Sequence, residues 1–286
     1  MDTRINKHLI GLLLVSSVAL TACSSHQNAP NSDATARTIV TAEALEQSFK
    51  RNVLAHREQG AIATQSFEAQ VRHAVRDHLN LDFTYLASAD KEQLTADLLQ
   101  TDARLSEFVH ASNRGSNLDQ LWALLPALPA LERRKALKIA LTSQFDEAPE
   151  LANERMAELM DLQLNRLFGD FTISLDALTP ETEEFEGMLV AGLKSEGFNI
   201  SARRPSLILE YFIDAYDNEG DIEVIADFEL KDRNAQTFHT VSNMTTYKAN
   251  KEGNAEQKAF DFLASDIAEQ LLDKALTRIN AVNQVK

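Results

Sequence analysis

The spacing of apolar residues changes near residue 169, and this change determines the fold class. Up to about Phe168 the chain is rich in Ala, Leu, Glu and Gln, and its apolar residues are spaced as on one face of a helix. Beyond Gly169, alternating segments rich in β-branched and aromatic residues appear, which are typical of strands. The sequence therefore predicts an α+β protein with a helical domain over residues 39–168 and a mixed domain over residues 169–286.

The helical half is predicted from apolar residues that recur at i, i+4 and i+8. Leu45, Phe49 and Val53 follow this spacing after Thr41, a residue type that caps helices, and Gly60 offers a stop. Prolines and an Asn-Arg-Gly turn interrupt the later segments, so we expect short helices. The expected helical segments are 42–59, 67–79, 91–99, 102–111, 118–125, 131–145 and 151–168. They contain no formal repeat, which leaves an irregular helical bundle or a stack of helix hairpins.

The mixed half is predicted to be a two-layer α/β sandwich. The alternating segment 171–177 is followed by Thr179-Pro180, which suits the start of a helix that would end at Gly197. A turn at 217–220 joins two alternating runs into a hairpin with one solvent-exposed face, and the Thr-rich run 238–247 is typical of an edge strand. The expected strands are 171–177, 198–200, 207–215, 222–230 and 238–247, before a final helix over 255–279. The order β-α-β-β-β-β-α would place helices on one face of a mainly antiparallel sheet.

Residues 1–22 have the layout of a secretory signal peptide. Arg4 and Lys7 precede an uncharged apolar run over residues 9–22. A membrane-spanning helix needs roughly 18 or more apolar residues, so this run is too short to span the bilayer readily as a permanent anchor. The run ends in Leu20-Thr21-Ala22-Cys23, which resembles the lipobox of bacterial lipoproteins.

This resemblance implies cleavage between Ala22 and Cys23, diacylglycerol on the Cys23 thiol, and an acyl chain such as palmitate on the new amine. Two or three acyl chains make a stable membrane tether, because each buried CH₂ group contributes about 0.8 kcal/mol. Without the preceding apolar run, the better interpretation of Cys23 would be a small buried hydrophobic residue. Ser24 stands where an Asp would imply retention in the inner membrane, so the resemblance implies the periplasmic face of the outer membrane. Residues 23–38 are expected to form a flexible tether.

Composition narrows the classes of partner and fold. Cys23 is the one cysteine of the chain, which excludes an intrachain disulfide and a cysteine-rich metal site. The formal net charge is −15 at pH 7, and an acidic surface repels phosphate backbones. We therefore expect no nucleic-acid binding, and we expect the folded part to depend on its hydrophobic core alone.

Three features of the helical half could carry chemistry, but each has a simpler interpretation. His73 and His78 lie on either side of Asp77, yet they are about 140° apart around a helix and would not share a metal ion. The basic run Arg133–Lys138 could contact an anion or a headgroup, although a solvated helix face is the favoured interpretation. Trp122 lies among leucines and is expected in the core.

The mixed half offers similarly weak candidates. The segment 217–221 has carboxylates and a glycine, but it lacks the residue order of a calcium loop, so a hairpin turn is favoured. Glu210 and Asp214 could form a carboxylate pair, although a wet strand face carries such acids routinely. His239 has no evident partner and is expected on the surface. The motifs of serine hydrolases, zinc enzymes and phosphate-binding loops are missing from the sequence, which predicts neither an enzyme nor a cofactor or metal.

The element order of residues 169–286 resembles small domains of envelope-assembly lipoproteins. These are the lipopolysaccharide-transport lipoprotein, the curli secretion lipoprotein and the lipoprotein activators of peptidoglycan synthases. The resemblance implies a non-catalytic interaction or assembly factor with a protein partner in the cell envelope. An accessory lipoprotein that binds a lipid or another apolar ligand is the alternative, and an enzyme with dispersed carboxylates, as in sugar hydrolases, is a third hypothesis.

Overall fold

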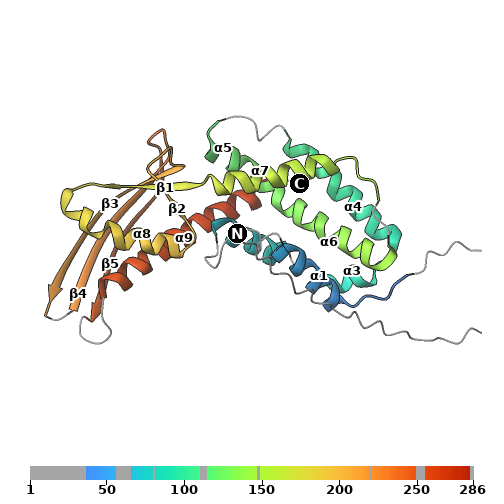
Figure 1. Ribbon diagram of the computed structural model, residues 1–286, viewed down its shortest axis with the longest axis horizontal. Helices are drawn as coiled ribbons and strands as arrows, with labels where there is room; N and C mark the ends of the chain where they lie inside the picture. The colour runs from blue at the N-terminus through green and yellow to red at the C-terminus, as the bar shows by residue number, and fades with distance from the viewer. Residues whose placement is uncertain are drawn as a thin grey trace, which may run out of the picture. The chain divides into compact units, whose positions relative to one another are not determined.

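The computed structural model describes residues 37–55, 66–79, 81–109, 115–146, 149–219, 221–248 and 255–283. Helices come first and a mixed sheet with two further helices follows, which confirms the predicted α+β class (Figure 1). The predicted signal peptide lies outside the described residues, as does nearly all of the predicted tether. Among the described residues, no helix combines the length and the apolar character that crossing a membrane requires.

The helical half differs from the prediction in where its helices are joined. Its elements are α1 (Ala42–Ala55), α2 (Phe67–Leu79), α3 (Phe83–Ser88), α4 (Lys91–Leu105), η1 (Ser106–Phe108), α5 (Asn117–Leu124), η2 (Leu125–Ala127), α6 (Leu128–Phe145) and α7 (Glu154–Gly169). The two helices expected over 91–99 and 102–111 are wrong, because α4 is continuous through Asp102. The carboxylate of Asp102 does not cap a new helix; it accepts hydrogen bonds from Arg134 and from the backbone N–H of Asn153. Pro129 lies in the first turn of α6, a position where proline is tolerated.

The mixed half has the predicted order of elements. It consists of β1 (Thr172–Ala177), η3 (Pro180–Phe185), α8 (Glu186–Ser195), β2 (Asn199–Ile200), β3 (Leu207–Asn218), β4 (Asp221–Lys231), β5 (Thr237–Lys248) and α9 (Ala255–Asn283). The sheet order is β2-β1-β3-β4-β5, so the predicted edge position of β5 is confirmed.

The strand directions are more mixed than expected. The long pairings of β3 with β4 and of β4 with β5 are antiparallel, but β1 is parallel to both of its neighbours. The reason is the connection through α8, because a chain that crosses over a helix returns to the sheet in the same direction. A turn joins β3 to β4, where Asn218 pairs with Asp221 and Glu219 has a φ of 55°. The predicted hairpin is therefore confirmed.

One face of the sheet is covered by α8 and α9 (Figure 1). Alternate residues of β3 and β4 are buried on this face, as the alternating sequence predicted. They pack into one hydrophobic cluster with residues of α8 and α9, including Leu193, Phe260 and Ile267. The buried strand residues are Leu207, Leu209, Tyr211, Ile213, Val224, Ala226, Phe228 and Leu230.

The same hydrophobic cluster extends into the helical half. Phe67 of α2 packs against Phe168, Phe171 and Phe198, with ring centroids 5.1–5.9 Å apart. A second cluster, built from α1, α3, α4 and α6, lies within the helical half. The change from helices to strands occurs between α7 and β1, close to residue 169, while the division into two domains stays a prediction.

Candidate functional site

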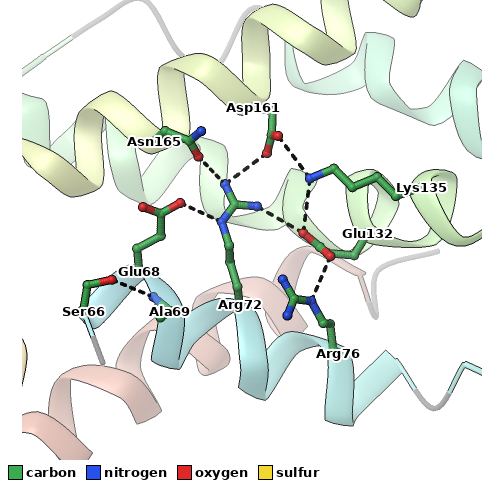
Figure 2. A network of polar contacts seen from close by, with 9 residues as sticks. All are labelled: Ser66, Glu68, Ala69, Arg72, Arg76, Glu132, Lys135, Asp161 and Asn165. Atoms are coloured by element: carbon green, nitrogen blue, oxygen red, sulfur yellow. Dashed lines mark hydrogen bonds and ion pairs between the residues drawn. The ribbon is translucent and has the colours of Figure 1, made fainter. Parts of the chain in front are cut away.

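A network of buried charges joins α2, α6 and α7 (Figure 2). At its centre the guanidinium of Arg72 lies 3.1 Å from Glu132 and 3.0 Å from Asp161, and Arg76 lies 2.9 Å from the second oxygen of Glu132. Lys135 lies 3.0 Å from Asp161. Glu132 is fully buried and Arg72 is 8% exposed. We call this set the Arg72 cluster; its members are Glu68, Arg72, Arg76, Glu132, Lys135, Asp161 and Asn165.

The charges of the Arg72 cluster stabilise one another in their ionised forms. Burial alone would raise the pKa of Glu132, but Lys135, Arg76 and Arg72 outweigh it and lower the pKa below the ordinary value. Burial likewise opposes ionisation of Asp161, and the nearby Arg72 and Lys135 lower its pKa. Carboxylates held in this way are poor proton donors at neutral pH. The arrangement fixes helices to one another, because Glu132 and Asp161 each contact bases from another helix.

A second set of ion pairs uses the basic run of α6. Arg134 donates to Asp102 at 2.8 Å and also to Glu154, and Lys138 donates to Glu154 at 2.7 Å. Arg134 is only 6% exposed. The favoured prediction of a solvated face for 133–138 is therefore wrong for Arg134, because the carboxylates of α4 and α7 draw it inward. The competing hypothesis is that this run binds an anion. Arg134 and Lys138 instead donate to carboxylates of this chain, which occupies the groups that an anion would need.

The face of the sheet opposite α8 and α9 presents a different surface. It carries the residues of β3, β4 and β5 that alternate with the buried ones, and we call it the open face. Tyr216 and Met244 are 41% and 63% exposed on it. Its described side chains are mainly acidic or apolar on β3 and β4, and hydroxyl-bearing on β5. They include Glu210, Phe212, Asp214, Tyr216, Glu223, Ile225, Asp227, Glu229, Lys231, Thr240, Ser242, Met244 and Thr246.

The acids of the open face are only partly neutralised. Glu210 and Glu229 lie directly opposite each other, a pairing of like charges that destabilises a sheet. Lys231 lies between them, with its ammonium 2.5 Å from Glu210 and 3.1 Å from Glu229. Asp214 and Asp227 remain exposed, and Lys231 is the one basic residue among the described side chains of this face. Glu210 and Asp214 thus share a face as expected, but Glu210 is bound to a lysine rather than paired with Asp214.

His239 is placed differently from the prediction. The register shifts between Leu230 and Lys231, so β5 holds one extra residue there and His239 pairs with Leu230 on the covered face. Its Nε2 is buried and lacks a hydrogen-bond partner among the described residues. Burial and the nearby Lys274 lower the pKa of His239 against the effect of Asp266. The expected surface position is wrong, because alternation along β5 places His239 on the covered face together with Val241.

The remaining candidates from the sequence, two histidines of α2 and Trp122, contact other residues of this chain. His73 is exposed and lies 3.4 Å from Asp77, while His78 contacts the carbonyl of Ala74 within the same helix. Trp122 is half-buried and stacks on Phe238, with ring centroids 5.6 Å apart. Among the residues that the structure describes, no group of three His, Cys, Asp or Glu side chains could hold a metal ion. Cys23 and Ala22, the predicted lipidation and cleavage residues, lie outside the described residues.

Among the hollows on the described part of the chain, the two best formed are small. One, of about 240 Å³, is lined by polar residues such as Gln100, Thr101 and Arg133 together with Leu79 and Pro129. The other, of about 80 Å³, lies at the aromatic contact of Phe67 and Phe198 described above. Sites for drug-sized ligands are typically about 300–1,000 Å³ and mostly apolar. The open face is therefore the stronger candidate for a functional surface.

Comparison with known proteins gives little further information. No protein-family model matches this sequence, and no curated protein matches it. Among solved structures, a minor lipoprotein from Acinetobacter baumannii is similar at 18% sequence identity and a TM-score of 0.25. The match covers 36% of this chain and 93% of that protein. A TM-score this low does not show a shared fold.

Proposed function

We propose that this chain is a lipid-anchored envelope protein that binds a protein partner without catalysing a reaction. The anchor is the lipid on Cys23 implied by the lipobox, and the place is the periplasmic face of the outer membrane. The observation that carries the binding role is the open face, where exposed aromatic and apolar side chains lie among acids on a sheet whose other face is packed.

Exposed apolar groups within a polar rim are typical of interaction surfaces. Tyr216 and Met244 are exposed on neighbouring rows of the open face. Ile225 lies beside Met244, and Phe212 lies in the following row; both are half-buried. These four side chains offer apolar contact, while Asp214 and its neighbouring acids favour a partner of opposite charge. Because a sheet is held by its backbone ladder, this surface is also pre-organised for binding.

The competing role as a lipid carrier lacks a comparable observation. It requires an apolar cavity, whereas the larger of the two described hollows has a volume of about 240 Å³ and is lined in part by Thr101, Arg104 and Arg133. A diacyl lipid would not be enclosed there. We therefore favour a protein partner over a lipid ligand.

Site-specific photo-crosslinking in cells tests the binding role. A photoreactive amino acid at Tyr216 should give an adduct with another protein, and the same amino acid at Glu92, an exposed position on α4, serves as the matched control. The proposal predicts an adduct at position 216 and none of the same mass at position 92. Absence of any protein adduct from the open face would contradict it.

A further inference from the structure

The sheet has one long free edge, which is β5. In the order β2-β1-β3-β4-β5, the edge at β2 is two residues long, whereas β5 spans twelve residues, Thr237–Lys248. Among the described strands, β5 pairs with β4 alone. Every second N–H and C=O along its outer side therefore points away from the sheet.

Between Thr240 and Thr246, the described residues of this edge lack the features that usually prevent edge-to-edge pairing. Natural edge strands carry charged residues, prolines, bulges or a covering element. Here the one register shift lies at the start of β5, and the pairing then runs without a break from Thr240. The charges are on the neighbouring β4, at Glu223, Asp227 and Glu229. The open-face residues of β5 from Thr240 to Thr246 are three hydroxyl-bearing residues and Met244.

We propose that the edge of β5 between Thr240 and Thr246 binds an extended segment of another protein, which adds to the sheet as a sixth strand. This inference rests on the proposed function, because it specifies how the protein partner is bound. Backbone hydrogen bonds along β5 supply the main attachment, and Met244 supplies an apolar contact on the open face.

Charge determines which segment fits. An added strand lies about 4.8 Å from β5 and therefore about 10 Å from β4, which is close to the Debye length in physiological salt. Glu223, Asp227 and Glu229 of β4 would act on its side chains across the uncharged β5 residues. A segment with Lys or Arg at alternate positions would bind more tightly, because its positive charges are attracted to these acids. A second copy of this chain fits less well, because each copy carries a formal net charge of −15.

The test places the photoreactive amino acid at Ser242 or Met244 of the full chain in cells, with Tyr216 and Glu92 as comparison positions. The inference predicts adducts with another protein at Ser242 and Met244. Mass spectrometry of those adducts should map the contact to a segment with basic residues at alternate positions. An adduct made of two copies of this chain, or a contact segment without such residues, would overturn the inference.

The comparison positions separate this inference from the proposed function. An adduct at Tyr216 together with none at Ser242 and Met244 would overturn the inference and leave the proposed function intact. No adduct at Ser242, Met244 or Tyr216 would overturn both.

A pair of charge variants tests the electrostatic part, with the photoreactive group kept at Ser242. Met244→Glu should give a higher adduct yield than Met244→Lys, by at least about twofold, since one attractive and one repulsive cross-strand charge pair of roughly 0.2–1 kcal/mol each separate the two variants. The two variants remove the same apolar side chain, and thermal unfolding checks that both are folded. Equal yields from the two variants would overturn the preference for a basic segment.

Discussion

At the scale of single residues, the most informative feature is the use of charge inside the helical half. Glu132 is fully buried, which would be unfavourable for an isolated carboxylate, but three bases from α2 and α6 surround it. Breaking such a set is costly because the remaining partner keeps its buried charge. Arg134, Lys135 and Lys138 of the basic run on α6 therefore bind internal carboxylates and stabilise the fold.

Arg72→Met should destabilise the protein by about 3–5 kcal/mol, because it leaves Glu132 and Asp161 buried with fewer bases. Urea unfolding at neutral pH measures this loss. Lys50→Ala is the matched control, since its pair with Glu46 lies on an exposed helix surface and should contribute less than about 1 kcal/mol. Similar losses in the two variants would contradict a structural role for the Arg72 cluster.

The same cluster predicts a pH dependence of stability. The folded pKa values of Glu132 and Asp161 lie below their ordinary values of 4.5 and 3.8, so the folded state binds fewer protons than the unfolded state as the pH falls. Their contribution is complete above about pH 5 and is lost progressively as acidification passes the ordinary values and then the lowered ones. Urea unfolding between pH 7 and pH 3 should show this decline. The decline should be smaller in Arg72→Met, and an equal decline in both proteins would contradict the assignment.

At the scale of elements, the close contact of α8 with α9 depends on Gly192. A Cβ atom at this position would lie 2.9 Å from the Cβ of Ala264 and 3.2 Å from the carbonyl oxygen of Phe260. Neither neighbour is the end of a flexible side chain, so a larger residue would force the two helices apart. The two helices that cover the sheet, α8 and α9, can therefore pack closely because Gly192 has no side chain.

Gly192→Ala should therefore destabilise the protein by roughly 1–3 kcal/mol, even though alanine favours a helix. Thermal or urea unfolding checks this prediction. Gly187→Ala in the same helix is the control, because nothing lies within 4 Å of its added Cβ, and it should be neutral or stabilising by up to about 1 kcal/mol. Stabilisation by both substitutions would contradict the close packing of α8 on α9.

The elements also show which structural features could be predicted from the sequence. Alternation and turn residues predicted the order of the elements along the chain, and the Thr-rich composition predicted the edge position of β5, because these patterns are local. The parallel pairings of β1 depend on a crossover, and the inward position of His239 depends on the register in which β5 pairs with β4. Both are properties of strand pairing rather than of local sequence. Asp is a residue type that often caps a helix. The carboxylate of Asp102 instead accepts a hydrogen bond from Arg134, and this tertiary contact explains why α4 continues past Asp102.

At the scale of the whole molecule, the candidate surface was only partly predictable. The wet face of the hairpin followed from alternation of acids and apolar residues, but the exposure of Tyr216 and Met244 depends on which face the helices cover. The lipobox, by contrast, is a continuous motif and needs no tertiary contact to be recognised. The membrane anchor is therefore predicted from the sequence, whereas the candidate surface is identified from the fold.

The central claim is that the chain acts at the membrane through a lipid on Cys23. Mass spectrometry of the mature protein, purified from membranes, tests it most directly by identifying the first residue and its mass. The account predicts a chain that begins at Cys23 and carries diacylglycerol and an additional acyl group. It also predicts that Cys23→Ala abolishes this processing and releases the protein from the membrane fraction. A mature chain that retains residues 1–22, or that begins at an unmodified Cys23, would contradict the account.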